Sequence, residues 1–308
     1  MAAALGRSDA LAQELCRRAV RRRAAIFVAL ALSAAALRAS AEPAPQRVVS
    51  LNPSLTAMAL ALGAGDQLVG VDDFSARQEP AVAQLPRVGG LYDPSLEAVV
   101  ALRPDLVMLV PSAEQRGFQE QLAALGIARF VANPVSYDEV LATIGALGVR
   151  LGRAREAEAR VAKLRQARER AAAASAGRAR VRALLVIQRD PLFVAGPGTF
   201  VDDMLRAAGA TNVAADLSGP WPRASREWLL AAQPELILDS TDEPEPAREF
   251  WARWPALRGR VVSLPAGLVT LPGPQLDRAL ARLEAAMRPA LGQSGSDPDW
   301  PSPAGSEP

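Results

Sequence analysis

A gapless internal repeat is the feature that most restricts how this chain can fold. The segment Glu97–Met108 (EAVVALRPDLVM) aligns without gaps on Glu227–Leu238 (EWLLAAQPELIL), 130 positions further along the sequence. Each copy begins with helical spacing, is stopped by a proline and continues into a short apolar run typical of a buried strand. One copy in each half of the chain predicts two similar lobes.

Short apolar runs alternate with helical patterns around both copies, which is typical of α/β folds with parallel-type sheets. Strands are expected at Val48–Leu51, Leu68–Val71, Leu106–Val110, Arg129–Ala132, Val181–Gln188, Leu236–Asp239 and Arg260–Leu264. Helices are expected at Pro53–Leu62, Leu96–Leu102, Glu114–Leu125, Val201–Ala208, Glu227–Ala232 and Gln275–Met287. A capping box of Ser136 with Glu139 predicts one more helix, which runs to about Leu147.

One segment between the two halves has a different character. Arg153–Ala174 contains no Gly or Pro and is rich in Ala, Glu and Arg, which predicts one long, solvated helix. The sequence therefore predicts two similar α/β lobes joined by one long rigid helix. The expected bounds are 42–150 for the first lobe, 151–177 for the linking helix and 178–290 for the second lobe.

The N-terminus has the order of a secretory signal. A cluster of five arginines ends at Arg23 and precedes the apolar run Ala24–Leu37, which small residues follow up to Ala41. The run is short for a membrane span, so residues 1–41 are expected to be a signal peptide cleaved before Glu42, with a retained membrane anchor as the alternative. This places the protein in the periplasm. The Gly-, Ser- and Pro-rich tail 291–308 is expected to be disordered.

The composition excludes several kinds of chemistry. The chain has no histidine, its one cysteine is Cys16 within the predicted signal, and its one lysine is Lys163. This excludes a Ser/His/Asp or Cys/His catalytic group, imidazole ligands to a metal, and a GxxxxGK phosphate loop. Removing seven arginines and two acidic residues with the signal leaves 28 basic against 31 acidic side chains, so no nucleic-acid partner is expected.

Acidic pairs are the remaining candidates for a metal site. Asp72-Asp73, Asp202-Asp203 and Asp239 with Asp242-Glu243 could ligate a hard cation. They have no fixed spacing, however, and such pairs more often cap helices or lie in solvated turns. No metal site and no cofactor are expected.

Three stretches carry a family resemblance. They are RVVSLNPSLTAMALALGAGDQLVGV from Arg47, LEAVVALRPDLV from Leu96 with QLAALGI, and PWPRASREWLLAAQPELIL from Pro220. Over about Arg47–Met287 the sequence resembles the periplasmic proteins that bind vitamin B12, iron siderophores and haem. The resemblance implies a monomeric binding protein, without enzymatic activity, that holds its ligand between two lobes and delivers it to the permease dimer of an ABC importer.

Aromatic side chains are the main candidates for ligand contact. Trp221 lies between two prolines, which fix the backbone of its loop. A rigid loop that displays an aromatic ring suits a flat, mostly apolar ligand; the alternative is that the Trp221 ring only packs beneath the loop. Phe74 and Phe193 stand where the vitamin B12-binding pattern also has aromatics, and both are expected on strand-exit loops. Tyr92 is a neighbouring candidate, because the family's Trp in this loop aligns on Leu91.

Two further positions bear on the ligand. Asn52 opens a helix whose N–H groups could meet an amide or carboxylate of the ligand, with plain N-capping as the alternative. With no histidine and no cysteine in the mature chain, a bound haem iron would have Tyr92, Tyr137 or a methionine as its protein ligand. Leu271–Pro274 replaces a stretch where some relatives have a ligand-contacting arginine, which disfavours a strongly anionic ligand.

Glu97 and Glu227 share the setting Ser-x-Glu at the start of the two repeated helices. An acidic residue in a first helical turn is favoured by the helix dipole alone. The family resemblance gives the two glutamates another role, docking onto arginines of the two permease subunits. We expect this docking role for both residues.

Two classes of function follow from these observations. The first is a solute-binding protein of an ABC importer, with cobalamin or another corrinoid as the expected ligand and haem or a ferric siderophore as the alternative. The second is a secreted hydrolase with two carboxyl groups about 5–10 Å apart in one cleft. Glu97 and Glu227 fit that second class poorly because each lies on its own lobe. A periplasmic sensor partner is a third alternative.

Overall fold

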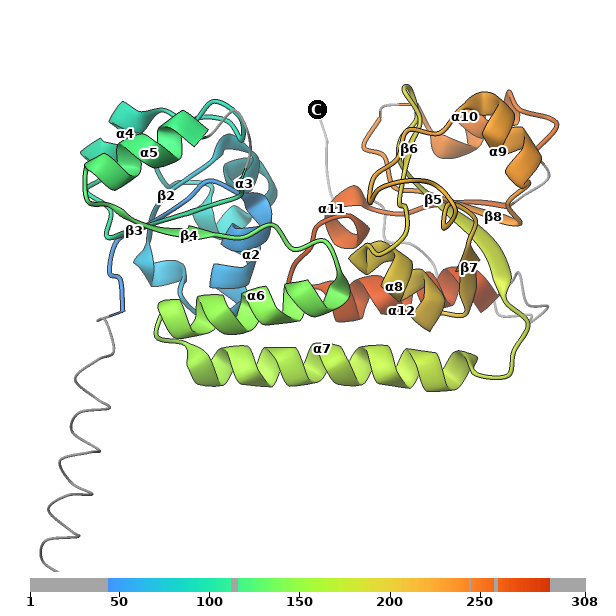
Figure 1. Cartoon of the computed structure of the whole chain (residues 1–308), viewed down its shortest axis with the longest axis horizontal. Coiled ribbons are helices and arrows are strands. Elements are labelled where there is room, and N and C mark those ends of the chain that lie inside the picture. Colours follow the sequence, from blue (N-terminus) through green and yellow to red (C-terminus); the bar gives the residue numbers. More distant parts are fainter. Residues whose placement is uncertain (1–43, 112–115, 244, 258–259, 289–308) are drawn as a thin grey trace, which may run out of the picture. The chain divides into compact units, whose positions relative to one another are not determined.

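The computed structural model describes residues 44–111, 116–243, 245–257 and 260–288 (Figure 1). The described residues from Pro45 onward form one compact unit. The predicted signal peptide and the predicted disordered tail lie outside the described residues. In the described ranges no helix has both the length and the apolar character that crossing a membrane requires.

The N-terminal lobe is built on a parallel sheet with strand order β2-β1-β3-β4. Its strands are β1 (Val48–Ser50), β2 (Leu68–Val71), β3 (Leu106–Leu109) and β4 (Ala128–Val131). Its helices are α2 (Pro53–Ala61), α3 (Asp73–Gln78), α4 (Leu96–Ala101) and α5 (Arg116–Ala124), with short 3-10 helices η1 (Gly65–Gln67) and η2 (Pro80–Val82). All four residues of β3 are buried, as expected for a parallel strand covered on both faces.

The C-terminal lobe has a second sheet, centred on β5 (Val181–Gln188). The other strands are β6 (Phe193–Val194), β7 (Ala210–Asn212), β8 (Leu236–Asp239) and β9 (Arg260–Ser263). The helices are α8 (Phe200–Ala207), α9 (Arg226–Ala232), α10 (Ala247–Ala252), α11 (Ala266–Val269) and α12 (Leu276–Met287). Since β8 occupies one edge of β5, the parallel β7 and the antiparallel β6 share the other edge. The order β7-β5-β8-β9 thus repeats β2-β1-β3-β4, with β6 added.

The two copies of the sequence repeat form equivalent structures, α4 with β3 and α9 with β8. The resemblance extends to the hydrogen bonds of each strand. The Asp105 carboxylate accepts from the backbone N–H of Arg47 at 2.9 Å, and the Glu235 carboxylate accepts from that of Arg182 at 2.8 Å. Both arginines also donate a guanidinium N–H to a backbone carbonyl at the end of the repeated helix. Arg47 donates to Leu102 at 2.7 Å, and Arg182 donates to Ala232 at 2.5 Å. The predicted fold of two similar α/β lobes is confirmed.

The predicted long helix is α7 (Ala154–Ser175), which packs along α6 (Tyr137–Arg150), α8 and α12 (Figure 1). Its buried residues are Ala157, Leu164 and Ala171, spaced seven apart, so one narrow stripe of this otherwise polar helix faces the protein. The capping box predicted at Ser136 and Glu139 begins α6.

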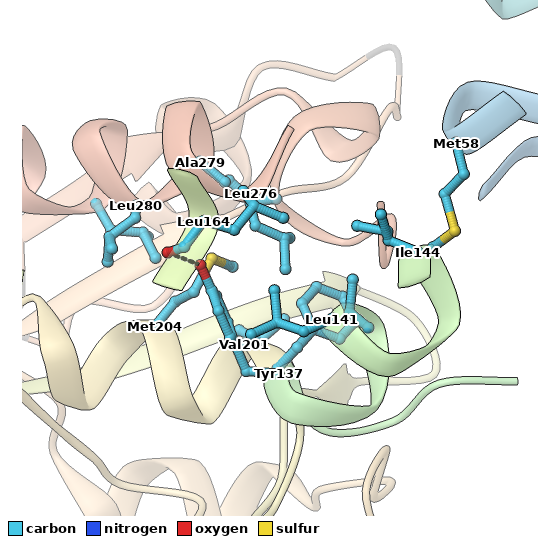
Figure 2. Packing of buried hydrophobic residues seen from close by; sticks show 14 of the residues in the cluster. Met58, Tyr137, Leu141, Ile144, Leu164, Val201, Met204, Leu276, Ala279 and Leu280 are labelled. Carbon is cyan, nitrogen blue, oxygen red and sulfur yellow. Dashed lines mark hydrogen bonds between the residues drawn. The ribbon is translucent and has the colours of Figure 1, made fainter. Parts of the chain in front are cut away.

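A single apolar cluster extends from both sheets to α6, α7 and α12. Figure 2 shows the part of this cluster that lies among the helices. Tyr137 is fully buried in it and donates its hydroxyl to the backbone carbonyl of Leu164 at 2.9 Å. Asp277 of α12 pairs with Arg160 of α7 at 2.6 Å and with Lys163 at 3.3 Å. The long helix is therefore fixed by a buried stripe, a buried hydroxyl and an ion-pair cluster.

Candidate functional site

The loop that carries Trp221 is held against the strand segment that follows β5. The Gly196 N–H donates to the Pro220 carbonyl at 2.9 Å, and the Val194 N–H donates to the Pro222 carbonyl at 3.2 Å. A Cβ at Gly196 would lie 2.3 Å from the Gly219 carbonyl oxygen, so the approach requires glycine at this position. The backbone of the Trp221 loop is thus fixed by pairing as well as by its two prolines.

The Trp221 ring itself is half-buried. It meets the buried ring of Phe200 edge-on, with ring centroids 6.0 Å apart and an angle of 65° between the planes. One part of the indole packs against the main apolar cluster, and the remainder is accessible. The ring therefore combines core packing with an exposed surface that a ligand can use.

Phe193 lies in strand β6, where a loop had been expected. It is half-buried, and its backbone forms a bridge to Arg223, directly after the Pro220–Pro222 loop. Two residues are too few to give a sequence pattern, which is why the strand was missed. The structure thereby brings Phe193 and the Trp221 loop onto neighbouring segments.

Phe74 lies in the first turn of α3, and not in a strand-exit loop. Its side chain is 44% exposed, and the Arg77 guanidinium lies 4.6 Å from the centre of its ring. Asp72 is the N-cap of α3, and its carboxylate accepts from the backbone N–H groups of Phe74 and Ser75, both at 2.9 Å. Asp72 is therefore a capping residue that fixes the backbone of Phe74.

A buried hydroxyl network supports this turn. Thr56 of α2 contacts both the Ser50 and the Ser75 hydroxyls at 2.8 Å, and Ser75 donates in turn to the Asp72 carboxylate. All four side chains are fully buried. The network joins β1, α2 and α3, so it holds the Phe74 turn against the end of the sheet. No sequence pattern indicates this network, because its members are up to 25 positions apart.

Asn52 and Tyr92 occupy contrasting environments. Asn52 is 8% exposed, and its side-chain oxygen accepts from the N–H groups of Ser54 at 2.9 Å and Leu55 at 3.3 Å. These two amides are therefore satisfied by the cap. Tyr92 is 67% exposed, whereas Tyr137 is fully buried. Burial raises the pKa of Tyr137 to about 12, although the charge of Arg168 acts in the opposite direction. Of the two tyrosines in the chain, Tyr92 is the accessible one.

The candidate ligand residues form two groups. Asn52 and Phe74 lie just beyond the carboxyl ends of the adjacent strands β1 and β2, while Phe193 and Trp221 belong to the C-terminal lobe. Within the described residues, no hydrogen bond or ring contact joins one group to the other. A hydrogen bond joins the start of α8 to the segment before α6: the Phe200 N–H donates to the Val135 carbonyl at 2.7 Å.

Glu97 and Glu227 are both exposed in the first turns of α4 and α9. The preceding serines cap these helices: Ser95 accepts from the Ala98 N–H at 3.2 Å, and Ser225 from the Trp228 N–H at 3.1 Å. Hydrogen bonds from its own N–H and from the Ser225 hydroxyl lower the pKa of Glu227. Glu227 thus contributes to the cap and is also available at the surface.

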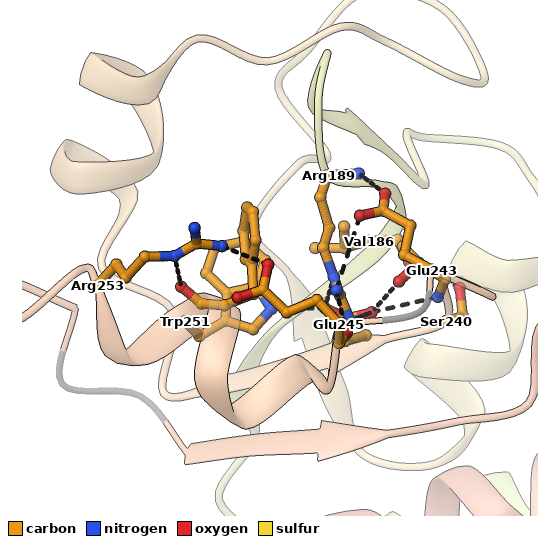
Figure 3. Close-up of polar contacts among 10 residues, drawn as sticks. Val186, Arg189, Ser240, Glu243, Glu245, Trp251 and Arg253 are labelled. Carbon is orange, nitrogen blue, oxygen red and sulfur yellow. Dashed lines mark hydrogen bonds and ion pairs between the residues drawn. The ribbon is translucent and has the colours of Figure 1, made fainter.

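Each acidic pair considered as a metal site contains a carboxylate that is engaged by protein groups. Asp202 accepts from the Asn212 side chain at 3.1 Å, and Asp239 accepts from Arg189 at 3.0 Å and from the Trp251 indole N–H at 2.5 Å (Figure 3). In the part of the chain that is described, no three His, Cys, Asp or Glu side chains are grouped so that they could hold a metal ion.

Comparison with known proteins adds to this geometry. Residues 48–259 match the periplasmic binding protein family. The chain is 29% identical over 242 residues to a vitamin B12-binding protein of Photorhabdus laumondii subsp. laumondii, covering 78% of this chain and 87% of that protein.

Two solved structures are also similar. A periplasmic heme-binding protein from Pseudomonas aeruginosa is 31% identical, with a TM-score of 0.69 over 80% of this chain and 94% of the other. The periplasmic vitamin B12 binding protein of Vibrio cholerae has the same fold, with a TM-score of 0.69 over 80% of this chain and 98% of the other at 24% identity.

Proposed function

Because this chain belongs to the periplasmic binding protein family, we propose that it captures a corrinoid and delivers it to the permease of an ABC importer. The supporting observation is the Trp221 loop, which presents a half-buried aromatic ring on a backbone locked by pairing to Val194 and Gly196. A ring held this way loses little freedom when a large flat ligand packs on it. Phe193 and Phe74 are proposed to contact the same ligand.

The proposed binding mode does not include a protein ligand to cobalt. The chain has no histidine, so no imidazole is available to displace the lower base of the corrinoid. Contacts are expected from aromatic side chains and from backbone groups instead. Asn52 is proposed to act indirectly, by fixing the start of α2 beside the site. No enzymatic step is part of this proposal.

One observation favours haem as a second candidate. Tyr92 is 67% exposed, and a phenol oxygen can ligate haem iron. Tyr137 is unsuited to this role, because it is fully buried with its hydroxyl bonded to Leu164. If haem is the ligand, Tyr92 is the tyrosine that would coordinate it, and Tyr92→Phe would change the absorption spectrum of the complex.

Delivery requires a surface that the permease recognises. We assign this role to Glu97 and Glu227, which are exposed at equivalent positions of the two lobes. Two acidic side chains in equivalent settings are suited to a permease dimer that offers the same basic groups twice. The pair is assigned to docking and not to hydrolysis, because each glutamate lies on its own lobe.

The decisive experiment is a calorimetric titration of residues 42–291 with cyanocobalamin, haemin and a ferric hydroxamate. One-to-one binding of cyanocobalamin, with the corrinoid recovered unchanged, is expected. Tight binding of haemin or the hydroxamate without cyanocobalamin binding would show that the ligand differs within the same class. Saturable hydrolysis of an ester or glycoside that a Glu→Gln change abolishes would overturn the binding function altogether.

A further inference from the structure

A hollow of about 910 Å³ opens on the C-terminal lobe beside Glu227. Its walls come from the turn after β5, from the start of α9 and from α10 with the turn that follows it. None of the proposed ligand-binding residues lines it. We call this hollow the α9–α10 groove. Its volume is sufficient for several side chains of another molecule.

A paired charge cluster, shown in Figure 3, contributes Arg189 and Trp251 to the lining of the groove. The Arg189 side chain is 2% exposed; it pairs with Asp239 at 3.0 Å and donates to the Glu245 carbonyl at 2.6 Å. The Trp251 indole donates to the same Asp239 carboxylate. Because its charge is balanced from within, Arg189 shapes the groove and is not itself the group that attracts a partner.

Two other arginines at the groove are not engaged in ion pairs with the described residues. Arg223 and Arg226 are both exposed, and within the described ranges neither forms an ion pair with a carboxylate. The Arg226 guanidinium lies over the Trp254 ring, 5.4 Å from its centre. A guanidinium stacked on an aromatic face is oriented while its N–H edge stays available for a carboxylate. By contrast, the nearby Arg253 is already paired with Glu245 at 2.5 Å.

The internal repeat shows that these arginines are not required by the fold. At an offset of 130, Asp93 and Leu96 stand in the N-terminal lobe where Arg223 and Arg226 stand in the C-terminal lobe. The capping serine and the exposed glutamate are the same in both lobes. The two arginines are thus present on the C-terminal lobe and absent from the equivalent positions of the N-terminal lobe.

We propose that the α9–α10 groove binds a segment of the permease that carries an acidic residue next to a basic one. The acidic residue would pair with Arg223 and Arg226, and the basic residue with Glu227. Asp190 and Glu227 also line the groove, so a purely anionic surface such as a lipid bilayer would be opposed by two carboxylates. This inference rests on the docking role proposed for Glu227. It also makes the two lobes unequal partners of the permease dimer.

The test measures binding of the ligand-loaded protein to the cognate permease complex in phosphatidylcholine nanodiscs. Four proteins are compared: the wild type, Arg223→Glu with Arg226→Glu, Glu227→Gln, and a control with Arg155→Glu and Arg170→Glu. The control makes the same charge change at two exposed positions of α7. Thermal unfolding and ligand titration establish that each variant is folded and loaded. A neutral variant, Arg223→Gln with Arg226→Gln, replaces the charge-reversed one if that variant does not fold.

The charge-reversed groove variant should bind the permease at least about tenfold more weakly, while the control changes by less than about twofold. Replacing one acidic residue of the permease by lysine should then restore binding to that variant. If Glu227→Gln weakens docking but the groove variant does not, the groove proposal is wrong and the docking role stands. If neither change matters, both fail. Arginine-dependent binding to empty phosphatidylglycerol discs, without any dependence on the permease, would identify lipid as the partner and overturn the proposal.

Discussion

Arg103 and Gln233, 130 positions apart, adopt the same left-handed backbone, with φ of 47° and 42°. Each precedes the proline that ends a repeated helix, and the residue before a proline is disfavoured in the right-handed helical region. They are the residues other than glycine with positive φ in the described chain. The repeat is therefore conserved between the lobes down to a strained backbone conformation, although the two side chains differ.

Glycine at position 103 and glycine at position 233 should change the free energy of unfolding differently, because the two side chains differ. Arg103→Gly should raise the free energy of unfolding by about 0.5 kcal/mol, because relief of the left-handed strain exceeds the entropy lost by glycine. Gln233→Gly should give no gain, since the Gln233 side chain donates to the carbonyls of Leu230 at 2.8 Å and Ala256 at 3.1 Å. Urea unfolding of both variants measures this difference. Equal effects would mean that the side-chain bonds of Gln233 contribute nothing.

Trp221→Ala should weaken ligand binding by about 1–3 kcal/mol, because the ring is proposed to be a central aromatic contact. It should also lower the thermal stability modestly, since part of the indole packs edge-on against Phe200. Calorimetry with the ligand and thermal unfolding of the ligand-free protein separate the two effects. Trp228→Ala is the control, because Trp228 packs in another apolar cluster. An equal loss of affinity in the control would argue against direct contact by Trp221.

Tyr137→Phe should lower the free energy of unfolding by roughly 1 kcal/mol, since it removes the hydrogen bond to the Leu164 carbonyl inside the core. The same burial raises the pKa of Tyr137 to about 12. A folded-state pKa above the unfolded value means that the stabilisation is complete below the ordinary tyrosine pKa and is lost as the pH rises above it. An ultraviolet absorbance titration should show one phenol ionising near pH 12 that Tyr137→Phe removes.

The ion-pair cluster between α7 and α12 should weaken in acid. Burial alone would raise the pKa of Asp277, but the hydrogen bond and charge of Arg160 outweigh it and hold this pKa below the usual range. The cluster therefore stabilises the fold above the ordinary aspartate pKa, and this contribution is lost as the pH falls through the lowered value. The loss of stability between about pH 6 and pH 3 should be smaller in Asp277→Asn. The control is Asp216→Asn, which makes the same substitution at an exposed position.

Reversing the charge of Glu97 and Glu227, the proposed docking residues, should separate ligand capture from delivery. Glu97→Arg with Glu227→Arg should bind the ligand normally, because neither residue is proposed to contact it. Stimulation of the importer's ATPase and ligand uptake should fall by at least about tenfold. The matched control is Glu156→Arg with Glu169→Arg on the exposed face of α7. Uptake at the wild-type level by the first variant would leave helix capping as the role of both glutamates.

Much of the fold could be predicted because its determinants are local in sequence. The repeat marks α4 with β3 and α9 with β8, and the Gly- and Pro-free composition marks α7. Strands β6 and β7 were missed, since two or three residues give no periodicity. These short strands form through pairing with β5, a tertiary interaction that sequence pattern does not report.

The site was predictable only in part, for the same reason. Single residues such as Trp221 and Asn52 could be selected from their immediate neighbours. The Ser50–Thr56–Ser75–Asp72 network and the pairing of Arg189 with Asp239 join residues that are distant in sequence. The partly packed state of Trp221 also depends on Phe200, which only the folded chain brings beside it.

The close approach at Gly196 has a consequence for how ligand choice can diverge in proteins of this kind. Because the path of the Trp221 loop is set by backbone pairing, by its two prolines and by the missing side chain at Gly196, we expect the path to be kept when the residue at position 221 is changed. The loop backbone is thus a fixed support on which different side chains could stand at position 221. If Trp221 contacts the ligand as proposed, a substitution at position 221 should alter selectivity and leave the loop in place, whereas a larger residue at position 196 should displace the loop and with it any ring at position 221.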